Sequence, residues 1–543
     1  MWALIDYIPS AQQAAVLDGT STVDLTSSVQ TALNTGKVIT LPPNGKVCIS
    51  SSLLVPANGG FTGDGSFLFF MLGSGFNNSS NVFANSYGSH AVGILCAGGN
   101  SSPFTPKANP TLEGFKITTD APDGRWLRPA VFSNCTNITA RNIEIYGFQG
   151  AWSGITIDSC VGGVVEQCHI HDCTTNDATF GNSQLTAIEI DNGRVNSIDS
   201  RRLRIVDNQV HDITVGSTFL AAHGYQTDGI NLNGLGGVGL IVSGNTISNV
   251  GEGIDHFGTG ATISGNTITD CYLWGVKMIH GPYRTVVQGN TIARCGYDCI
   301  LIAAADTGKH ASGNIIADNV CYDPDPNGIN STHEPACIRV DDVTVAPTLN
   351  LIDGNSLDPG QHGAWCVTDV SGGVGNVGSN MLVAAGTLGW IKTHDNNRYR
   401  PAIRTAFRAS RTSNQTIASL TLVTVLFATE IFDDRGEYDP STGIWTCQVK
   451  GLYQFQSQVK LTLEPGKTVY LGCILTVGGT ASTYSNSEYT NPGGSSVPVT
   501  IFTSDIISCD QGNTVKVQVY HQNSGATAID GSGPTNYFTG APA

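Results

Sequence analysis

Three acidic residues, Asp228, Glu252 and Asp255, have the side-chain chemistry and the spacing that acid–base catalysis needs. Glu252 and Asp255 stand three residues apart in the stretch VGEGIDHFG, in a chain where charged residues make up only 13% of positions. Acids that lie close together cannot all ionise independently, so the pKa of one should rise and leave a proton donor near neutral pH. Hydrolysis of a glycosidic bond needs such a donor and a second carboxylate that activates water or attacks carbon. Glu252 is therefore the candidate catalytic acid or base, with Asp228 and Asp255 as its partners.

A repeat with a period in the low twenties predicts how the chain brings these acids together. The segments VSGNTISNV, ISGNTITDC, VQGNTIARC and ASGNIIADN are variants of one unit with a Gly-Asn turn and short β-type runs. The apolar residue after each Asn marks one column, which weaker copies extend: Ile145, Ile170, Val210, Ile247, Ile268, Ile292, Ile316 and Leu357. Such a period is typical of a parallel β-helix in which each repeat is one coil.

A second strand in each coil alternates apolar and polar residues, which predicts the side chains that face outward. We expect an inward column of Ile188, Ile230, Ile254, Val276, Ile300 and Ile338. The outward column is then Glu189, Asn231, Asp255, Lys277, Leu301 and Arg339. The turn positions before the strand hold Asp228, Glu252, Trp274 and Asp298. Because coils stack about 4.8 Å apart, Asp228 and Glu252 should lie one coil apart at the surface near Asp255, whereas His256 should point into the core.

Insertions in the turn between the two strands predict a groove over the acids. The markers of the two strands are 7 or 8 residues apart in the coils of Ile247, Ile268 and Ile292, but 18 to 22 residues apart in the flanking coils. Segments 174–187, 215–227 and 323–336 would then form walls around a floor of three lean coils. The candidate substrate-binding residues are Trp274, Lys277, Asn231, Phe257, Asp298, Glu189, Tyr225 and His223, with His333 and Glu334 also on the walls. The alternative is that the insertions only decorate the surface and that each acid is a solvated turn residue.

Composition and charge narrow the class of protein. The 65 glycines favour turns and β-structure over long helices, and 543 residues exceed what one hydrophobic core usually organises. Lys and Arg total only 27 and the net charge is −16. This excludes a basic surface that could bind the backbone of a nucleic acid, and it disfavours membrane insertion. The start MWALIDYIPSAQQ lacks the pattern of a signal peptide. The fifteen cysteines are expected to be mostly reduced and buried, with no metal site and no cofactor.

The N-terminal stretch IDYIPSAQQAAVLDGTSTVDLTSSVQTALNTGKVITLPP resembles the opening of pectate-lyase-like β-helix proteins, notably bacteriophage tailspikes. Its segment DLTSSVQTALNTG predicts a short helix that covers the first coil, followed by the strand KVITLP. The resemblance implies a homotrimer in the virion that acts extracellularly, and binds and cuts a bacterial surface polysaccharide such as capsule, exopolysaccharide or O-antigen. It also matches Glu252, Asp255 and Asp228 to acids of a tailspike hydrolase. Tailspikes usually begin with a virion-binding domain, so either such a region was removed or the chain attaches through another phage tail or baseplate protein.

The residue pattern of the sequence changes from about residue 403. Short alternating strands between Gly, Asn and Pro turns predict a β-sandwich. This part resembles the jelly-roll head of complement and tumour-necrosis-factor proteins through Phe407, Ala409, Phe427, Phe432, Tyr438, Gly443, Gly451, Tyr453, Phe455, Phe538 and Gly540. We therefore expect an all-β chain with a capping segment at 1–40, a right-handed, single-stranded parallel β-helix at 41–395, a linker at 396–402 and a jelly roll at 403–543. The jelly roll would serve trimerisation, carbohydrate binding or both.

Two other functions fit parts of the same pattern. A polysaccharide lyase would use a basic residue, Lys277, Arg284 or His280, to remove a proton beside a uronate carboxylate. A purely adhesive receptor-binding protein would use the groove without any catalysis.

Overall fold

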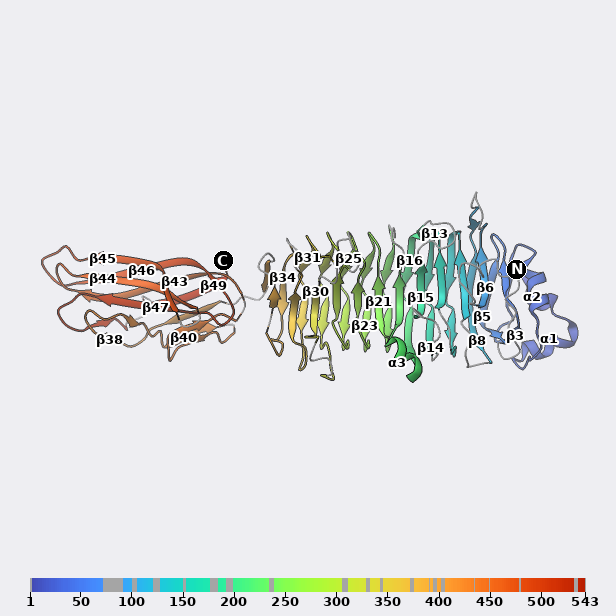
Figure 1. The fold of residues 1–543 in the computed structure, drawn as a ribbon, viewed down its shortest axis with the longest axis horizontal. Coiled ribbons are helices and arrows are strands. Elements are labelled where there is room, and N and C mark those ends of the chain that lie inside the picture. The colour runs from blue at the N-terminus through green and yellow to red at the C-terminus, as the bar shows by residue number, and fades with distance from the viewer. Residues whose placement is uncertain are drawn as a thin grey trace. The chain divides into compact units, whose positions relative to one another are not determined.

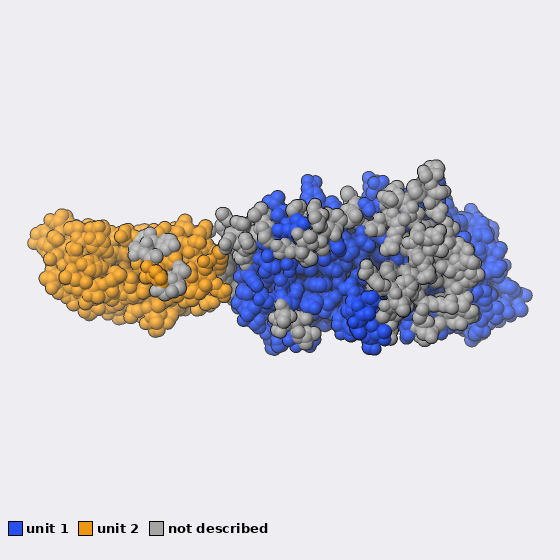
Figure 2. All heavy atoms as spheres, in the orientation of Figure 1, with its two compact units in different colours: residues 1–399 blue, residues 400–543 orange. Residues whose placement is uncertain are grey.

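The computed structural model has two compact units, Met1–Tyr399 and Arg400–Ala543, which Figure 2 draws in different colours. The division falls inside the predicted 396–402 linker. The structure describes residues 2–71, 91–99, 105–120, 127–149, 153–175, 184–191, 199–233, 239–304, 311–328, 333–341, 345–371, 376–389, 391–393, 398–401, 406–433, 435–448, 450–477, 480–531 and 536–542. Parts of two predicted insertions, 176–183 and 329–332, lie outside these residues, as do 396, 397 and 402 of the linker.

The first unit is a parallel β-helix whose strands stack along its length (Figure 1). Twelve described strands form one sheet: β4 Leu53–Val55, β6 Ala91–Ala97, β9 Leu127–Ser133, β12 Ser153–Asp158, β15 Leu185–Asp191, β18 Thr227–Leu232, β21 Glu252–His256, β24 Val276–Met278, β27 Ile300–Ala303, β30 Ala336–Asp341, β33 Trp365–Asp369 and β35 Ile391–Thr393. Pairing between successive strands is parallel throughout this sheet.

A second sheet takes two strands from most coils, one more than the sequence alignment recognised. Its described strands are β1 Trp2–Ala3, β2 Val38–Thr40, β3 Lys46–Ile49, β5 Gly60–Phe70, β7 Lys107–Ala108, β8 Thr111–Thr119, β10 Cys135–Arg141, β11 Glu144–Tyr146, β13 Val161–Glu166, β14 His169–Thr175, β16 Arg201–Val206, β17 Gln209–Val215, β19 Ile241–Ser243, β20 Thr246–Ser248, β22 Thr262–Ser264, β23 Thr267–Thr269, β25 Val286–Gln288, β26 Thr291–Ala293, β28 Ile315–Ala317, β29 Val320–Tyr322, β31 Leu351–Asp353, β32 Ser356–Asp358, β34 Val377–Leu382 and β36 Arg398–Pro401.

The repeated Gly-Asn pairs form the corner between the two strands of this sheet. Gly265 has a φ of 64°, in the left-handed region where glycine has no steric penalty. The following Asn266 is buried, accepts from Asn245 Nδ2 at 2.8 Å and donates to Asn290 Oδ1 at 2.9 Å. The ladder runs through Asn208, Asn245, Asn266, Asn290, Asn319, Asn355 and Asn380. It satisfies amide groups that would otherwise be buried without partners.

The prediction that Ile316 belongs to the same column as Ile292 is wrong. Ile316 lies in the neighbouring column, where it pairs with Val287. The partner of Ile292 is Cys321, which pairs in turn with Leu357. The distance from first to second marker in this coil is therefore 17 residues, from Cys321 to Ile338, and this turn is still longer than those of the lean coils.

A second buried asparagine ladder explains the error. Asn314, in the segment ASGNIIADN, accepts from the backbone N–H of Thr285 and donates to Asn350. The residue that stacks on Asn290 in the next coil is Asn319, which stands five positions after Asn314. Both ladders place an asparagine before a short apolar strand, so the local sequence does not distinguish them.

The interior of the β-helix unit is one continuous apolar core. The described markers Ile145, Ile170, Val210, Ile247 and Ile268 are buried and stack in register. All fifteen cysteines are free and buried, which confirms the prediction of reduced interior thiols. At the N-terminal end lie a 3-10 helix at Leu4–Tyr7, α1 at Ser10–Leu17 and α2 at Thr26–Leu33, of which the sequence predicted the last, together with the strand that follows it.

The second unit is a β-sandwich of two antiparallel sheets around its own aromatic core. One sheet contains β37 Phe407–Ser410, β38 Gln415–Ile417, β40 Thr429–Asp433, β43 Gly451–Leu463, β46 Val497–Cys509, β48 Thr527–Ile529 and β49 Tyr537–Pro542. The other contains β39 Val423–Thr424, β41 Tyr438–Asp439, β42 Ile444–Thr446, β44 Thr468–Val477, β45 Thr480–Thr490 and β47 Thr514–His521. The all-β prediction is confirmed, and no helix among the described residues is long and apolar enough to cross a bilayer.

Candidate active site

The strand register brings the three candidate acids together. Asp228 in β18 pairs with Glu252 in β21, and Asn231 pairs with Asp255, which pairs with Lys277 in β24. These pairings agree with the alignment of coils made from the sequence. Asp228 and Glu252 belong to the strands themselves rather than to the turns before them.

The acids are buried, contrary to the predicted surface location. Asp228, Glu252 and Asp255 each have an exposed fraction of 0%. Their cover includes Lys277, whose Nζ lies 3.0 and 2.9 Å from the two oxygens of Glu252 and 3.4 Å from Asp255 Oδ2. Alternation correctly turned Asp255 away from the apolar core, whereas Asp228 and Glu252 were expected in turns before the strands. Alternation says nothing about what covers these side chains.

Burial changes the protonation of this cluster. Loss of hydration and the nearby charge of Glu252 raise the pKa of Asp228 to about 8 and hold the pKa of Asp255 well above its usual range. Burial alone would lower the pKa of Lys277, but Asp255 and Glu252 outweigh that effect and raise it. The cluster therefore combines a lysine whose pKa is raised with two aspartic acids whose pKa values are also raised.

The three acids also have the composition of a cation site. One oxygen from each lies within 4.8 Å of the others. The Lys277 ammonium, however, already contacts Glu252 and Asp255 and supplies the compensating positive charge. A metal ion at this position would have to displace Lys277, so the cluster fits a metal poorly.

A pocket of about 400 Å³ opens beside the cluster. It is lined by Gln184, His223, Gln226, Asp255, Phe257, Lys277 and His280. His223 ends the short helix α3, Ser217–His223, which forms part of the predicted wall at 215–227. Four of these lining residues, His223, Asp255, Phe257 and Lys277, are predicted from the sequence. Gln184 and Gln226 are not, because a glutamine in an insertion gives no distinctive signal. His280 entered only as a possible lyase base.

Aromatic side chains line the coils around the acids. Tyr225 stacks on Tyr272 with ring centroids 4.2 Å apart, and Trp274 lies 5.2 Å from Tyr297. Lys277 Nζ lies 5.3 Å from the centre of the Trp274 ring. Tyr272 and Tyr297 are not among the residues predicted for the site, although each lies just before the second strand of a lean coil.

The predicted substrate ligand Asp298 is engaged within the protein. Asp298 accepts from Trp274 Nε1 at 3.2 Å, from the Ala336 backbone N–H at 2.8 Å and from Arg339 Nε at 3.2 Å, and it contacts His333 Nε2 at 2.9 Å. Asp298 therefore holds the end of the third insertion and the strand β30 that follows it. The predicted wall residue Glu334 pairs with Lys392.

Glu189 also forms a buried ion pair, with Arg128. It accepts a further hydrogen bond from Thr156 at 3.4 Å. Glu189 stands beside Asn231 in the sheet but outside the group formed by Asp228, Glu252 and Asp255.

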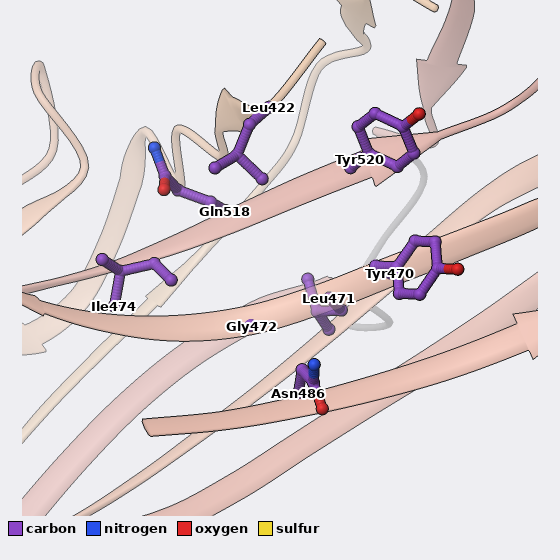
Figure 3. Close-up of a pocket in the computed structure, with 8 residues that line it drawn as sticks. All are labelled: Leu422, Tyr470, Leu471, Gly472, Ile474, Asn486, Gln518 and Tyr520. Carbon is purple, nitrogen blue, oxygen red and sulfur yellow. The ribbon is translucent and has the colours of Figure 1, made fainter. Parts of the chain in front are cut away.

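A second pocket, of about 260 Å³, lies in the β-sandwich unit (Figure 3). Its lining residues are Leu422, Tyr470, Leu471, Gly472, Ile474, Asn486, Gln518 and Tyr520. The rings of Tyr470 and Tyr520 lie 5.7 Å apart.

Comparisons with known proteins assign the two folds. Residues 197–372 match the family described as right handed beta helix region, and residues 406–541 match the C1q domain. A mutant tailspike of Escherichia coli bacteriophage HK620 in complex with a pentasaccharide is 11% identical, with a TM-score of 0.50 over 100% of this chain and 93% of that one.

Two further solved structures are similar to parts of the chain. The A-module of Azotobacter vinelandii mannuronan C-5 epimerase AlgE4 is 12% identical, with a TM-score of 0.44 over 74% of this chain and 100% of that one. The globular domain of zebrafish complement 1qA is 17% identical, with a TM-score of 0.19 over 25% and 94%. A comparison with curated protein sequences gave no match. The chain thus joins a right-handed parallel β-helix to a C1q domain.

Proposed function

We propose that this protein is a phage tailspike depolymerase, which binds a bacterial surface polysaccharide and hydrolyses an internal glycosidic bond. The observation that carries the proposal is Asp255, a buried acid with a raised pKa that lines the pocket beside a second carboxylate. Glycosidases use this combination of a protonated acid and an ionised one.

The contacts suggest separate roles for the acids. Asp255 lines the pocket and retains its proton, so it is suited to protonate the leaving glycosidic oxygen. Lys277 Nζ donates to both oxygens of Glu252, and we assign Glu252 the role of stabilising positive charge at the sugar ring. Asp228 accepts a hydrogen bond from Asn231 Nδ2 at 2.8 Å and holds a further proton within the cluster. Water then adds to the sugar carbon and restores the proton to Asp255.

Several features support a polysaccharide as substrate. The pocket combines two glutamine amides and two histidines with the ring of Phe257, and the tyrosine and tryptophan pairs extend the surface along the coils. Flat aromatic faces and convergent polar groups suit sugar rings, which present both apolar and hydroxylated sides. The similar fold of a phage tailspike bound to a pentasaccharide supports the same class of ligand here. We place the protein in the virion, attached to a phage tail or baseplate protein and acting at the host surface.

Incubation with purified capsules, exopolysaccharides and O-antigens from a broad strain panel should yield oligosaccharides that are each heavier by one water than the repeat they contain. Mass spectrometry and a reducing-end assay measure this directly. A uronate-specific lyase would instead give unsaturated products that absorb ultraviolet light. Binding without any cleavage across the panel would contradict the hydrolase proposal and favour a purely adhesive protein.

The lyase alternative rests on His280 rather than on Lys277. Lys277 is paired with two acids and its pKa is raised, so it is a poor base. Arg284 lies over the Tyr283 ring, whereas His280 lines the pocket. If unsaturated products form and disappear in His280→Ala, elimination is the reaction.

We further propose a homotrimer, supported by apolar residues on the outer face of the C1q unit. Leu452, Phe502 and Ile506 are 46%, 44% and 55% exposed on the paired strands β43 and β46. Such residues on one sheet face favour association with other copies.

Replacing Phe502 and Ile506 with Lys should therefore reduce the mass in solution from three chains to one, because charge would be placed in the apolar interface. Light scattering of the full chain measures this mass. The control Leu420→Lys changes a residue that is 66% exposed in the same unit but lies before β39, in the other sheet, and should remain trimeric. A wild-type protein with the mass of one chain would refute the trimer.

A further inference from the structure

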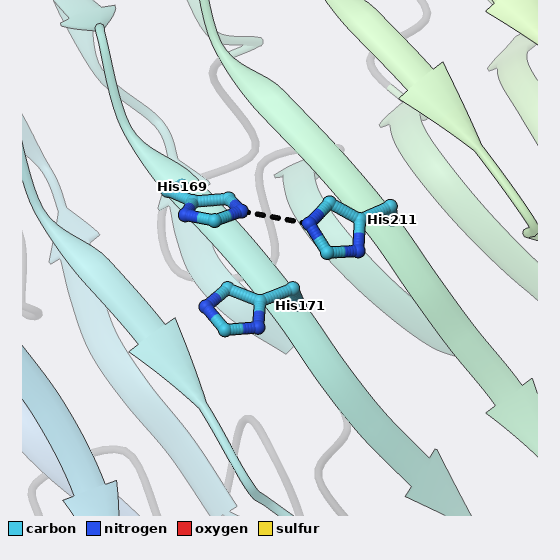
Figure 4. Close-up of side chains that lie close together, drawn as sticks. All are labelled: His169, His171 and His211. Carbon is cyan, nitrogen blue, oxygen red and sulfur yellow. Dashed lines mark hydrogen bonds between the residues drawn. The ribbon is translucent and has the colours of Figure 1, made fainter.

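Three histidines form a cluster on a different sheet of the β-helix from the acids. His169 and His171 lie in β14, and His211 in β17 is the register partner of His171. Alternate residues of a strand share one face, so the register places all three imidazoles on the same side of the sheet. Figure 4 shows the rings turned toward one another from neighbouring strands.

The ring nitrogens are close enough to share one ligand. One nitrogen from each histidine lies within 4.8 Å of the others, and Nε2 of His169 is 2.8 Å from Nε2 of His211. All three side chains are half-buried. Bonds of about 2.0–2.1 Å to a tetrahedral zinc ion would put two nitrogens about 3.3 Å apart. A small rotation of one imidazole would make this adjustment.

Neighbouring carboxylates hold two of the rings in the orientation that metal binding needs. Nδ1 of His171 lies 2.8 Å from Asp172 Oδ2, and Nδ1 of His211 lies 2.7 Å from Asp212 Oδ2. Asn249 donates to the other oxygen of Asp212 and fixes that carboxylate. Metal-binding histidines almost always bond a carboxylate or carbonyl through the second ring nitrogen, which leaves the first free for the ion.

We propose that His169, His171 and His211 bind one divalent transition-metal ion, of which zinc fits best. Three imidazoles are a common set of ligands for zinc, and this metal tolerates an oxygen or water as the fourth. Glu144 Oε1, which is 3.3 Å from His171 Nε2, is positioned to supply that oxygen. The ion would bridge β14 and β17 and so link two successive coils. The segments HIHD and VHD of adjacent repeats already carry this signal in the sequence, although the cysteine pattern had predicted no metal site.

Zinc titrated into the full-length, tag-free chain should bind with a stoichiometry of one ion per chain. Isothermal calorimetry measures this, and cobalt provides an independent spectroscopic reading of tetrahedral nitrogen ligands. The double variant His169→Ala/His211→Ala should lose the site. The control His362→Ala removes an exposed histidine in the turn after β32 and should bind zinc as the wild type does.

The variant Asp212→Asn tests the orienting carboxylate separately from the ligands. It keeps all three imidazoles but weakens the hold on His211, so zinc affinity should fall about 10- to 100-fold. Zinc should also raise the melting temperature of the wild type and of His362→Ala, and leave the double variant unchanged. Equal zinc binding by the wild type and the folded double variant would overturn the proposal, as would wild-type protein that binds no zinc.

Discussion

Asp255→Asn should abolish polysaccharide cleavage while leaving the fold and the affinity for oligosaccharide intact. The pKa of Asp255 is held well above its usual range, and asparagine copies the shape of a protonated carboxyl without offering an acidic proton. Loss of a general acid lowers the rate about 100- to 10,000-fold. The turnover number on a cleavable polysaccharide and calorimetric binding of its fragments measure the two effects independently.

The matched control is Asp270→Asn. Asp270 is an exposed acid in the turn after β23 whose partner is Arg294, outside the pocket. Its loss should leave turnover unchanged. Wild-type turnover in Asp255→Asn would exclude Asp255 as the proton donor and return that role to Glu252 or Asp228.

Asp228→Asn should flatten the pH dependence of the stability of the β-helix unit. Burial raises the pKa of Asp228 from 3.8 to about 8, so between these values the folded chain holds a proton that the unfolded chain has released. Stability is then fully present below pH 4 and falls as pH rises toward 8, by an amount on the order of several kcal/mol. Asparagine cannot titrate and keeps an acceptor for Asn231. The melting temperature of the variant, relative to the wild type, should therefore increase steadily from pH 5 to pH 8.

Asp270→Asn provides a control of opposite sign. The hydrogen bond from Arg294 lowers the pKa of Asp270, so this acid contributes stability that is lost as pH falls. Its replacement should matter most near pH 7 and least in acid. A constant difference between Asp228→Asn and the wild type over the whole pH range would show that Asp228 is ionised in the folded protein.

The sequence predicted the architecture well because the β-helix repeats its constraints in every coil. Alternation in GIDHF correctly turned Ile254 and His256 inward, and His256 is fully buried with Nε2 2.8 Å from Thr285 Oγ1. Burial lowers the pKa of His256 to about 4, as expected for a core histidine. The register from Asp228 to Glu252 followed from the same alignment.

What the sequence could not predict depends on contacts between coils or on long insertions. Two asparagine ladders look alike locally, which displaced Ile316 by one column. The contact of Lys277 with Glu252 and the hydrogen bonds to Asp298 depend on side-chain geometry that residue spacing does not specify. We propose that Asp255 carries the catalytic proton, because burial and the charge of Glu252 raise its pKa, whereas the sequence favoured Glu252 as acid or base.

The helix α3 leaves the β-helix after β17 and the chain returns in register at β18, where Ile230 continues the buried column. The wall that carries His223 is thus a removable module: its length and chemistry can change without a shift in any stacked coil. Under the proposed function, exchange of this one segment would alter which glycan enters the pocket while the acids beneath remain in place. Host range and catalysis would then reside in separate segments of the same chain.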